Sequence, residues 1–361
     1  MQFLRSTRGS RKKKLRKRQV QRRRIHGDER LENRIDEGND HALVMKIEQK
    51  CDSSLASSGS TSSSTSSTPL TSGSTSSTCS WRNEEEDFDD GEKELAGFDF
   101  VDRKICRERV SRRSKNAQRG IFLLKETSSG KLHVLKTVKQ PGGAVEARIQ
   151  KRLVDAGTPN ILPLRKYFLT EEAGHCLIVD FCRHGDLQGA LQKTLGLPEK
   201  DVARYLRNVL QALEGMHALG IAHRDVKPAN VMLDDDGKAV LADFGLAAEG
   251  VSACGGLSRP AGTPSYMSPE QITGEYGFAS DIWGLGVMAF ELVVGRPPFF
   301  ALQRTVLIKK ICSHQPFATE RLVRRGVSPQ MIDFINLCLT RDAASRPSAA
   351  SLLDHPAIYK P

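Results

Sequence analysis

Four polar side chains in the second half of the chain could together handle a phosphate group. Asp225, Lys227 and Asn230 lie in the segment IAHRDVKPANVML, and Asp243 lies in the segment ADFG that follows it. A carboxylate can accept a proton, an ammonium group can neutralise phosphate charge, and carboxylate and amide oxygens are the ligands that Mg²⁺ prefers. Groups of these types can bind a phosphate and act on it where the fold brings them together.

These two segments, in their order and separation, resemble the catalytic and metal-binding loops of the eukaryotic protein kinase family, serine/threonine type. The resemblance implies that ATP and Mg²⁺ are the cofactors. It implies that Asp225 accepts or orients the proton of a substrate hydroxyl and that Lys227 steadies the γ-phosphate. It also implies that Asn230 and Asp243 hold Mg²⁺. Either aspartate alone would pass for a turn residue, so the prediction depends on the combination.

A lysine and a glutamate upstream complete the resemblance. Lys136 ends HVLK on a predicted strand and is similar to the lysine that pairs with the α- and β-phosphates in that family. The helical segment AVEARIQKRL offers Glu146 as the partner of that lysine. The alternative for Glu146 is a surface carboxylate of a helix.

The segment that should cover the phosphates is the weak point of the resemblance. The family pattern G-x-G-x-x-G-x-V aligns with Lys115, Ala117, Gly120 and Phe122, so one of three glycines remains. Glycine matters because backbone N–H groups approach phosphates closely where no Cβ intervenes. This eroded loop supports an alternative function, a pseudokinase scaffold that binds partners without catalysis.

The resemblance also implies a hinge and a substrate-docking loop. Val179 would guard the back of the adenine pocket, and the backbone from Asp180 to Cys182 would bind adenine. In the docking loop GTPSYMSPE, residues 262–270, we expect Glu270 to form a buried ion pair with Arg346. Lys227 and Thr263 favour serine/threonine specificity.

A serine in the preceding loop is a candidate for regulation. A phosphate on Ser258 could be clamped by Arg224, which would activate the protein. The alternative is that Ser258 is an ordinary loop serine.

Hydrophobic patterns divide the second part of the chain into a strand-rich and a helical half. GIFLLKET and KLHVLKTV predict a β-hairpin, and helical periods begin at Asp201, Ser280 and Pro329. The predicted fold is α+β and bilobal. A small antiparallel β-sheet N-lobe spans residues 97–179, and a larger helical C-lobe spans residues 180–361.

The first 96 residues predict a disordered tail. The net charge is +11, yet residues 1–26 hold twelve of the Lys and Arg and no acid. Residues 53–80 are Ser/Thr-rich, and residues 84–94 are acidic. The basic segment could bind importins or another acidic partner, nucleic acid or acidic membranes, or remain a solvated charge run; these alternatives stay open.

Composition also predicts where the protein works. The eight cysteines form neither a CxxC pair nor a dense disulfide pattern, and no long apolar run occurs. We expect an intracellular protein of the nucleus or cytoplasm, without a transmembrane segment, that acts on protein substrates.

Overall fold

The structure is a computed structural model that describes residues 94–102, 119–138, 142–171, 173–253, 255–313 and 317–359. The predicted tail, with its basic, Ser/Thr-rich and acidic segments, lies outside the described residues except for residues 94–96. Lys115 and Ala117 also lie outside them. No helix of the described residues is long and apolar enough to cross a membrane.

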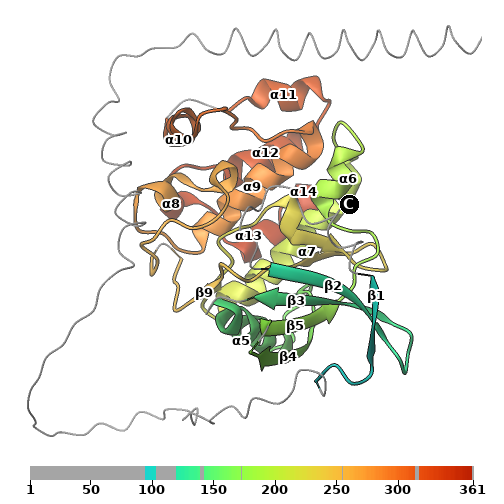
Figure 1. The fold of residues 1–361 in the computed structure, drawn as a ribbon. Helices are drawn as coiled ribbons and strands as arrows, with labels where there is room; N and C mark the ends of the chain where they lie inside the picture. The colour runs from blue at the N-terminus through green and yellow to red at the C-terminus, as the bar shows by residue number, and fades with distance from the viewer. Residues whose placement is uncertain are drawn as a thin grey trace, which may run out of the picture. The chain divides into compact units, whose positions relative to one another are not determined.

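The N-terminal part is one antiparallel sheet with strand order β1-β2-β3-β5-β4. Figure 1 shows helix α5, Gly142–Asp155, beside this sheet. The predicted hairpin is present as β2 and β3, whose turn contains Gly130 in the left-handed region at φ 71°. The strands are β1 Phe98–Asp102, β2 Arg119–Glu126, β3 Leu132–Val138, β4 Leu164–Thr170 and β5 Gly174–Asp180.

Side chains of this sheet alternate between two faces, and each face has its own apolar cluster. On one face Leu124, Leu135 and Ile178 form a buried cluster. On the other face Val138 and Leu177 pack with Ala147 of α5. Lys136 shares the face of Val138 because residues two apart in a strand point the same way. Helix α5 therefore covers the face that carries Lys136.

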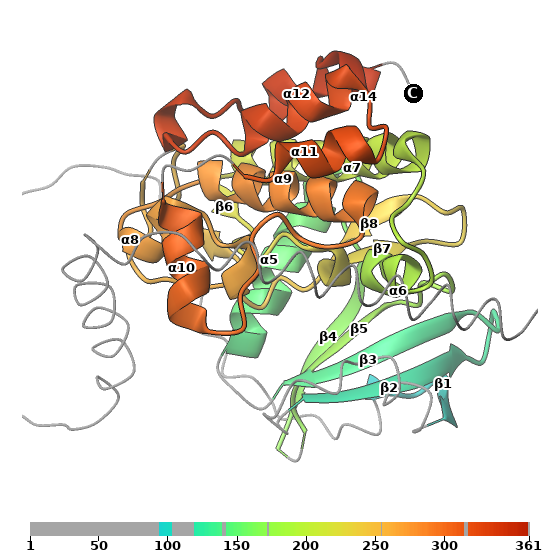
Figure 2. The same cartoon turned by 90° about the horizontal axis from the view of Figure 1, so that it is seen from above.

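The C-terminal part is helical, as predicted, and encloses a helix that is buried almost along its whole length. This helix, α9, has buried side chains from Ala279 to Val293 and ends at Gly295 in the left-handed region. Figure 2 shows the other helices around it. The helices of this part are α6 Leu187–Gln192, α7 Glu199–Ala218, α8 Pro269–Thr273, α9 Ala279–Val294, α10 Arg304–Cys312, α11 Thr319–Arg324, α12 Pro329–Cys338, α13 Ala349–Leu353 and α14 Pro356–Tyr359.

Short elements between α7 and α8 carry the loops of interest. Strand β6, Ile221–Ala222, pairs with β9, Ala248–Glu249. Strand β7, Val231–Leu233, pairs with β8, Ala239–Leu241. The 3₁₀ turns η1, Pro228–Asn230, and η2, Pro264–Tyr266, lie in the same stretch, and η3, Ala343–Ser345, follows α12. The sheet-bearing N-lobe and helical C-lobe confirm the predicted fold class.

Candidate active site

A buried aspartate fixes the loop that follows β6. Asp281, in the first turn of α9, accepts hydrogen bonds from the backbone N–H groups of His223 at 2.9 Å and Arg224 at 2.7 Å. Burial raises the pKa of Asp281, but the hydrogen bonds and charge of His217 together with the contacts to His223 outweigh burial and bring the pKa below its usual value. This anchor holds Arg224 at φ 71°, a backbone conformation that is costly outside glycine.

Three of the predicted site residues meet at the carboxylate of Asp225, which is 7% exposed. Its Oδ1 accepts the backbone N–H of Thr263 at 2.8 Å. Its Oδ2 accepts Nδ2 of Asn230 at 3.0 Å and Nζ of Lys227 at 2.5 Å. Lys227 Nζ also donates to the Thr263 hydroxyl at 2.6 Å. Both carboxylate oxygens are therefore oriented by fixed donors.

Asn230 and Asp243 lie at the same end of the β7–β8 hairpin. Val231 pairs with Leu241, and the backbone N–H of Ala242 donates to the Asn230 carbonyl at 2.9 Å. Asn230 directly precedes β7, while Asp243 follows β8 in the left-handed region at φ 62°. The hairpin thus brings the predicted metal ligands to one edge.

Lys136 joins the sheet to this hairpin. Its ammonium group forms an ion pair with Glu146 of α5 and a second one, of 2.8 Å, with Oδ1 of Asp243. Burial lowers the pKa of Lys136, but the charges of Asp243 and Glu146 outweigh burial and raise the pKa above 10.5. The lysine therefore remains protonated, and the predicted Lys136–Glu146 pair is present.

The predicted hinge contributes apolar surface and backbone. Val179 and Cys182 are buried in one cluster with Ala242. Burial, followed by nearby carboxylates, raises the pKa of Cys182 to about 12, so its thiol stays neutral. The carboxylate of Asp180 is bound by Arg165, with Nε at 2.7 Å from Oδ1. The side chain of Asp180 is thus engaged by Arg165, and the adenine contact stays a prediction about the backbone of this segment.

The alignment that assigned Phe122 to the nucleotide face is wrong. Phe122 pairs with Leu135, whereas Lys136 pairs with Ile121. Paired residues of antiparallel strands share a face, and adjacent residues do not. Phe122 therefore lies on the face opposite Lys136, where it packs against the cluster that contains Leu124.

Gly120, like Phe122, belongs to the face of the sheet opposite Lys136. Its N–H donates to the Thr137 hydroxyl at 3.0 Å, and a Cβ at Gly120 would lie 2.6 Å from that oxygen. Close packing between strands, rather than phosphate approach, accounts for this glycine. From β2 it is Ile121 and Leu123 that share the Lys136 face, and the alignment missed them.

A model of a known protein family matches most of this chain. The model of the protein kinase domain matches residues 112–358. This chain belongs to the protein kinase family. The match spans the residues of the candidate site, so the resemblance noted in the sequence is confirmed.

Three curated relatives of this kinase domain are themselves named as kinases. The mouse mitogen-activated protein kinase kinase kinase kinase 3 is 30% identical over 73% of this chain and 30% of its own length. Human serine/threonine-protein kinase PAK 4 is 36% identical over 51% of this chain and 31% of its own. Serine/threonine-protein kinase dst4 of Dictyostelium discoideum is 36% identical over 51% of this chain and 39% of its own. The chain thus covers about a third of these relatives' length.

The kinase domain's donor set at the hairpin fits Mg²⁺. Both hydrogen bonds that the described residues give the Asn230 amide use its nitrogen, which leaves the amide oxygen for a cation. The Asp243 side chain is 38% exposed and therefore accessible. No three His, Cys, Asp or Glu side chains within the described ranges gather as a metal site. A cation here would complete its shell with phosphate and water oxygens, as Mg²⁺ does.

The predicted buried ion pair of the docking loop is present. Nη1 of Arg346 lies 2.7 Å from Oε1 of Glu270, and the arginine side chain is fully buried. Arg346 also donates to the carbonyl of Thr340 and lies 5.2 Å from the ring centroid of Trp283. The pair joins the docking loop to the C-terminal helices.

Contacts of two residues in or next to the docking loop were missed because no local pattern signals them. Gln271 donates to the carbonyls of Arg224 at 3.2 Å and Ala261 at 2.8 Å, which ties α8 to both loops. The hydroxyl of Tyr266 donates to the buried carboxylate of Glu291 in α9. The capping pattern around Ser268 predicts only where α8 begins.

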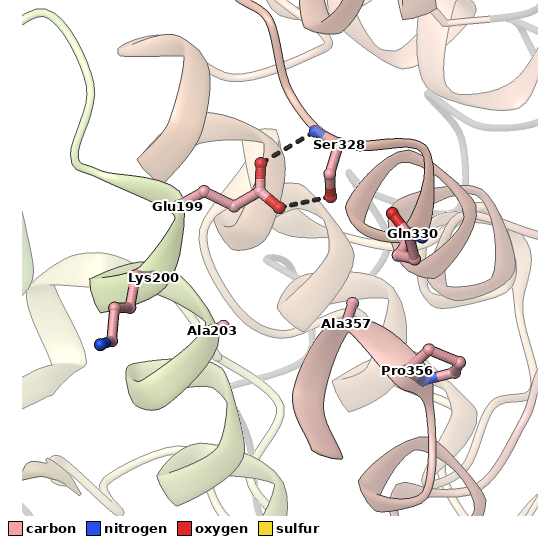
Figure 3. A pocket seen from close by; sticks show the side chains of 7 residues that line it. All are labelled: Glu199, Lys200, Ala203, Ser328, Gln330, Pro356 and Ala357. Carbon is pink, nitrogen blue, oxygen red and sulfur yellow. Dashed lines mark hydrogen bonds between the residues drawn. The ribbon is translucent and has the colours of Figure 1, made fainter. Parts of the chain in front are cut away.

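A separate pocket of about 440 Å³ lies away from these residues. Figure 3 shows it between α7, α12 and α14, where the Glu199 carboxylate accepts the N–H of Ser328 at 2.9 Å. None of the predicted site residues lines it. This carboxylate joins the first turns of two helices, which is a structural role.

Proposed function

We propose that this chain is a protein serine/threonine kinase that transfers the γ-phosphate of ATP to serine and threonine hydroxyls. The observation that carries the proposal is the Asp225 carboxylate, held by Lys227, Asn230 and Thr263. Asp243 and the Lys136–Glu146 pair provide charge beside the same hairpin.

The residues act by position and charge. The substrate hydroxyl oxygen bonds to the γ-phosphorus, the bond to the β–γ bridging oxygen breaks, and the hydroxyl proton passes to Asp225 as ADP departs. Lys227 lies beside the acceptor and stabilises the transferred phosphate. Lys136 binds the α- and β-phosphates. Mg²⁺, held by Asn230 and Asp243, would supply positive charge to the phosphates when bound.

Serine/threonine specificity is supported by the relatives' names and by the Lys227–Thr263 contact. The pseudokinase alternative had the eroded glycine pattern as its only support. The Lys136–Glu146 ion pair and the Asp225 carboxylate with its fixed donors instead support a catalytic protein.

Properties of the remaining chain belong to the same proposal. We assign residues 97–361 to the kinase domain and the basic segment of residues 1–26 to an acidic partner such as an importin, with activity in the nucleus or cytoplasm. The clustered positive charge supports this assignment. Removal of residues 1–26 should abolish salt-sensitive partner binding and leave turnover unchanged.

The test is the chemical identity of the product. The full chain is incubated with γ-labelled ATP, Mg²⁺ and a peptide library that contains Ser, Thr and Tyr acceptors. The proposal expects label on serine and threonine. Label confined to tyrosine, or no label in any peptide, would contradict it.

A further inference from the structure

The outer side of α5 is fastened to β9 by a single carboxylate. Oε2 of Glu249 accepts Nη2 of Arg148 at 2.7 Å, and Oε1 accepts Nη1 of Arg152 at 2.7 Å. The two arginines lie four residues apart and so project from the same side of the helix. Figure 1 shows β9 beside α5. Each oxygen of Glu249 therefore binds one arginine of α5.

The contact between Glu249 and α5 lies next to the segments that lead into both loops of the proposed active site. Arg152 also donates to the carbonyl of Leu219, at the carboxyl end of α7, at 3.2 Å. Strand β9 follows the Asp243 loop, and its partner β6 leads directly into the Asp225 loop. Glu249 thus connects α5 to the two segments that carry the catalytic groups.

The position of α5 matters because Glu146 is on it. Glu146 is 3% exposed and pairs with Lys136, and Gln150, one turn later, donates to the carbonyl of Leu162 at 2.7 Å. These contacts hold the inner side of α5, while Glu249 holds the outer side. A helix released on its outer side can rotate or shift, and Glu146 then leaves Lys136.

An added phosphate would be a common way to gather arginines around a loop. Here a carboxylate already performs that function. Arg224, the expected phosphate clamp, is also engaged: its Nε donates to the Tyr276 hydroxyl at 3.0 Å and its Nη2 donates to the Arg259 carbonyl at 3.1 Å. The Tyr276 hydroxyl donates to the same carbonyl at 2.7 Å. Groups of the protein itself therefore bind Arg224 as well as the two arginines of α5.

We propose that Glu249 is a positioning residue that replaces an activating phosphate by holding α5, through Arg148 and Arg152, where Glu146 pairs with Lys136. This inference rests on the proposed kinase function. It makes catalysis independent of phosphorylation at Ser258.

The first test compares turnover in phosphatase-treated full-length proteins. Wild type should keep its turnover after treatment, and Glu249→Gln should lower kcat about fivefold with an unchanged melting temperature. The matched control is Lys151→Ala, which removes an exposed ion pair with Asp155 from the same helix and should equal wild type. Charge reversal, Glu249→Arg with both arginines changed to Glu, should restore most of the lost turnover.

The second test is hydrogen exchange of α5, which requires no catalysis. Glu249→Gln should speed exchange in residues 142–155 and leave α9 unchanged, whereas Lys151→Ala should not. Faster α5 exchange in a protein whose wild type transfers no phosphate would reject the kinase function and retain the role of Glu249. An active wild type with the same kcat and α5 exchange in Glu249→Gln would overturn the inference, as would loss of wild-type turnover after phosphatase treatment.

Discussion

Two different atoms of Thr263 bind two side chains of the proposed catalytic site. Its backbone N–H donates to Asp225, and its hydroxyl accepts from Lys227. The ammonium group of Lys227 is therefore held between a carboxylate and a hydroxyl before any substrate binds. Such preorganisation saves the cost of ordering these groups during the reaction.

Removing the Thr263 hydroxyl should impair catalysis while retaining the fold. Thr263→Val keeps the side-chain shape and the backbone donor but releases Lys227 on one side, so kcat should fall on the order of tenfold. Thr263→Ser keeps the hydroxyl and should stay near wild type. Steady-state kinetics check both variants, and equal kcat values for Val and Ser would refute this role.

Site residues could be predicted from the sequence where residue types suited to the chemistry occur at the spacing of the family motifs. Asp225, Asn230 and Asp243 stand in short segments with few alternatives, and Lys136 lies within a strand of clear alternation. The segment aligned with the glycine-rich loop lacks two of the three family glycines, so the alignment of β2 with the family pattern could not be fixed to a single residue. In a strand a one-residue error moves a side chain to the opposite face, which is what happened at Phe122.

At the scale of elements, η2 is docked to α9 by Tyr266 and Glu291. Burial raises the pKa of Glu291 above its usual 4.5, although the hydrogen bond from Tyr266 acts in the opposite direction. The folded protein therefore binds a proton at Glu291 up to a higher pH than the unfolded chain. The free energy of unfolding consequently falls as pH rises from 4.5 through the raised pKa.

Glu291→Gln should reveal this dependence. Gln does not titrate and can still accept from Tyr266, so the melting temperature of the variant relative to wild type should rise as the pH increases from 4.5 through the raised pKa of Glu291. Thermal melts across this range check it. The control is Glu320→Gln, on the exposed side of α11. A difference in melting temperature between Glu291→Gln and wild type that stays constant with pH would contradict the expectation.

The helices of the C-lobe were predictable from their periodicity, but the contacts between distant segments were not. Asp281 binds the backbone of a loop 57 and 58 positions away, and Glu249 binds arginines about a hundred positions earlier. Neither contact leaves a local pattern, because each depends on how the chain folds back. The fold class could thus be predicted from the sequence, whereas the network of contacts that positions the site could be seen only in the structure.

At the scale of the whole molecule, Arg346 is a junction between the docking loop and the C-terminal helices. It pairs with Glu270, and it donates to the carbonyls of Ala279 and Thr340. Its side chain is fully buried, so its removal leaves the carboxylate of Glu270 without its partner.

Arg346→Ala should destabilise the folded protein by about 3 to 5 kcal/mol. The melting temperature should fall by about 10 °C, with a lower soluble yield. The control is Arg204→Ala, which removes an exposed contact with Asp201 and should change melting little. Scanning calorimetry of both variants checks this, and an unchanged melting temperature for Arg346→Ala would contradict the assigned role.

Turnover of Asp225→Asn, together with its affinity for Mg²⁺·ATP, tests the central claim most directly. Asn keeps the shape of the side chain but loses the negative charge that accepts the proton, so kcat should fall on the order of a thousandfold while nucleotide affinity changes little. Asp236→Asn, in the exposed β7–β8 turn, should match wild type. Phosphate transfer by Asp225→Asn at the wild-type rate would contradict the account.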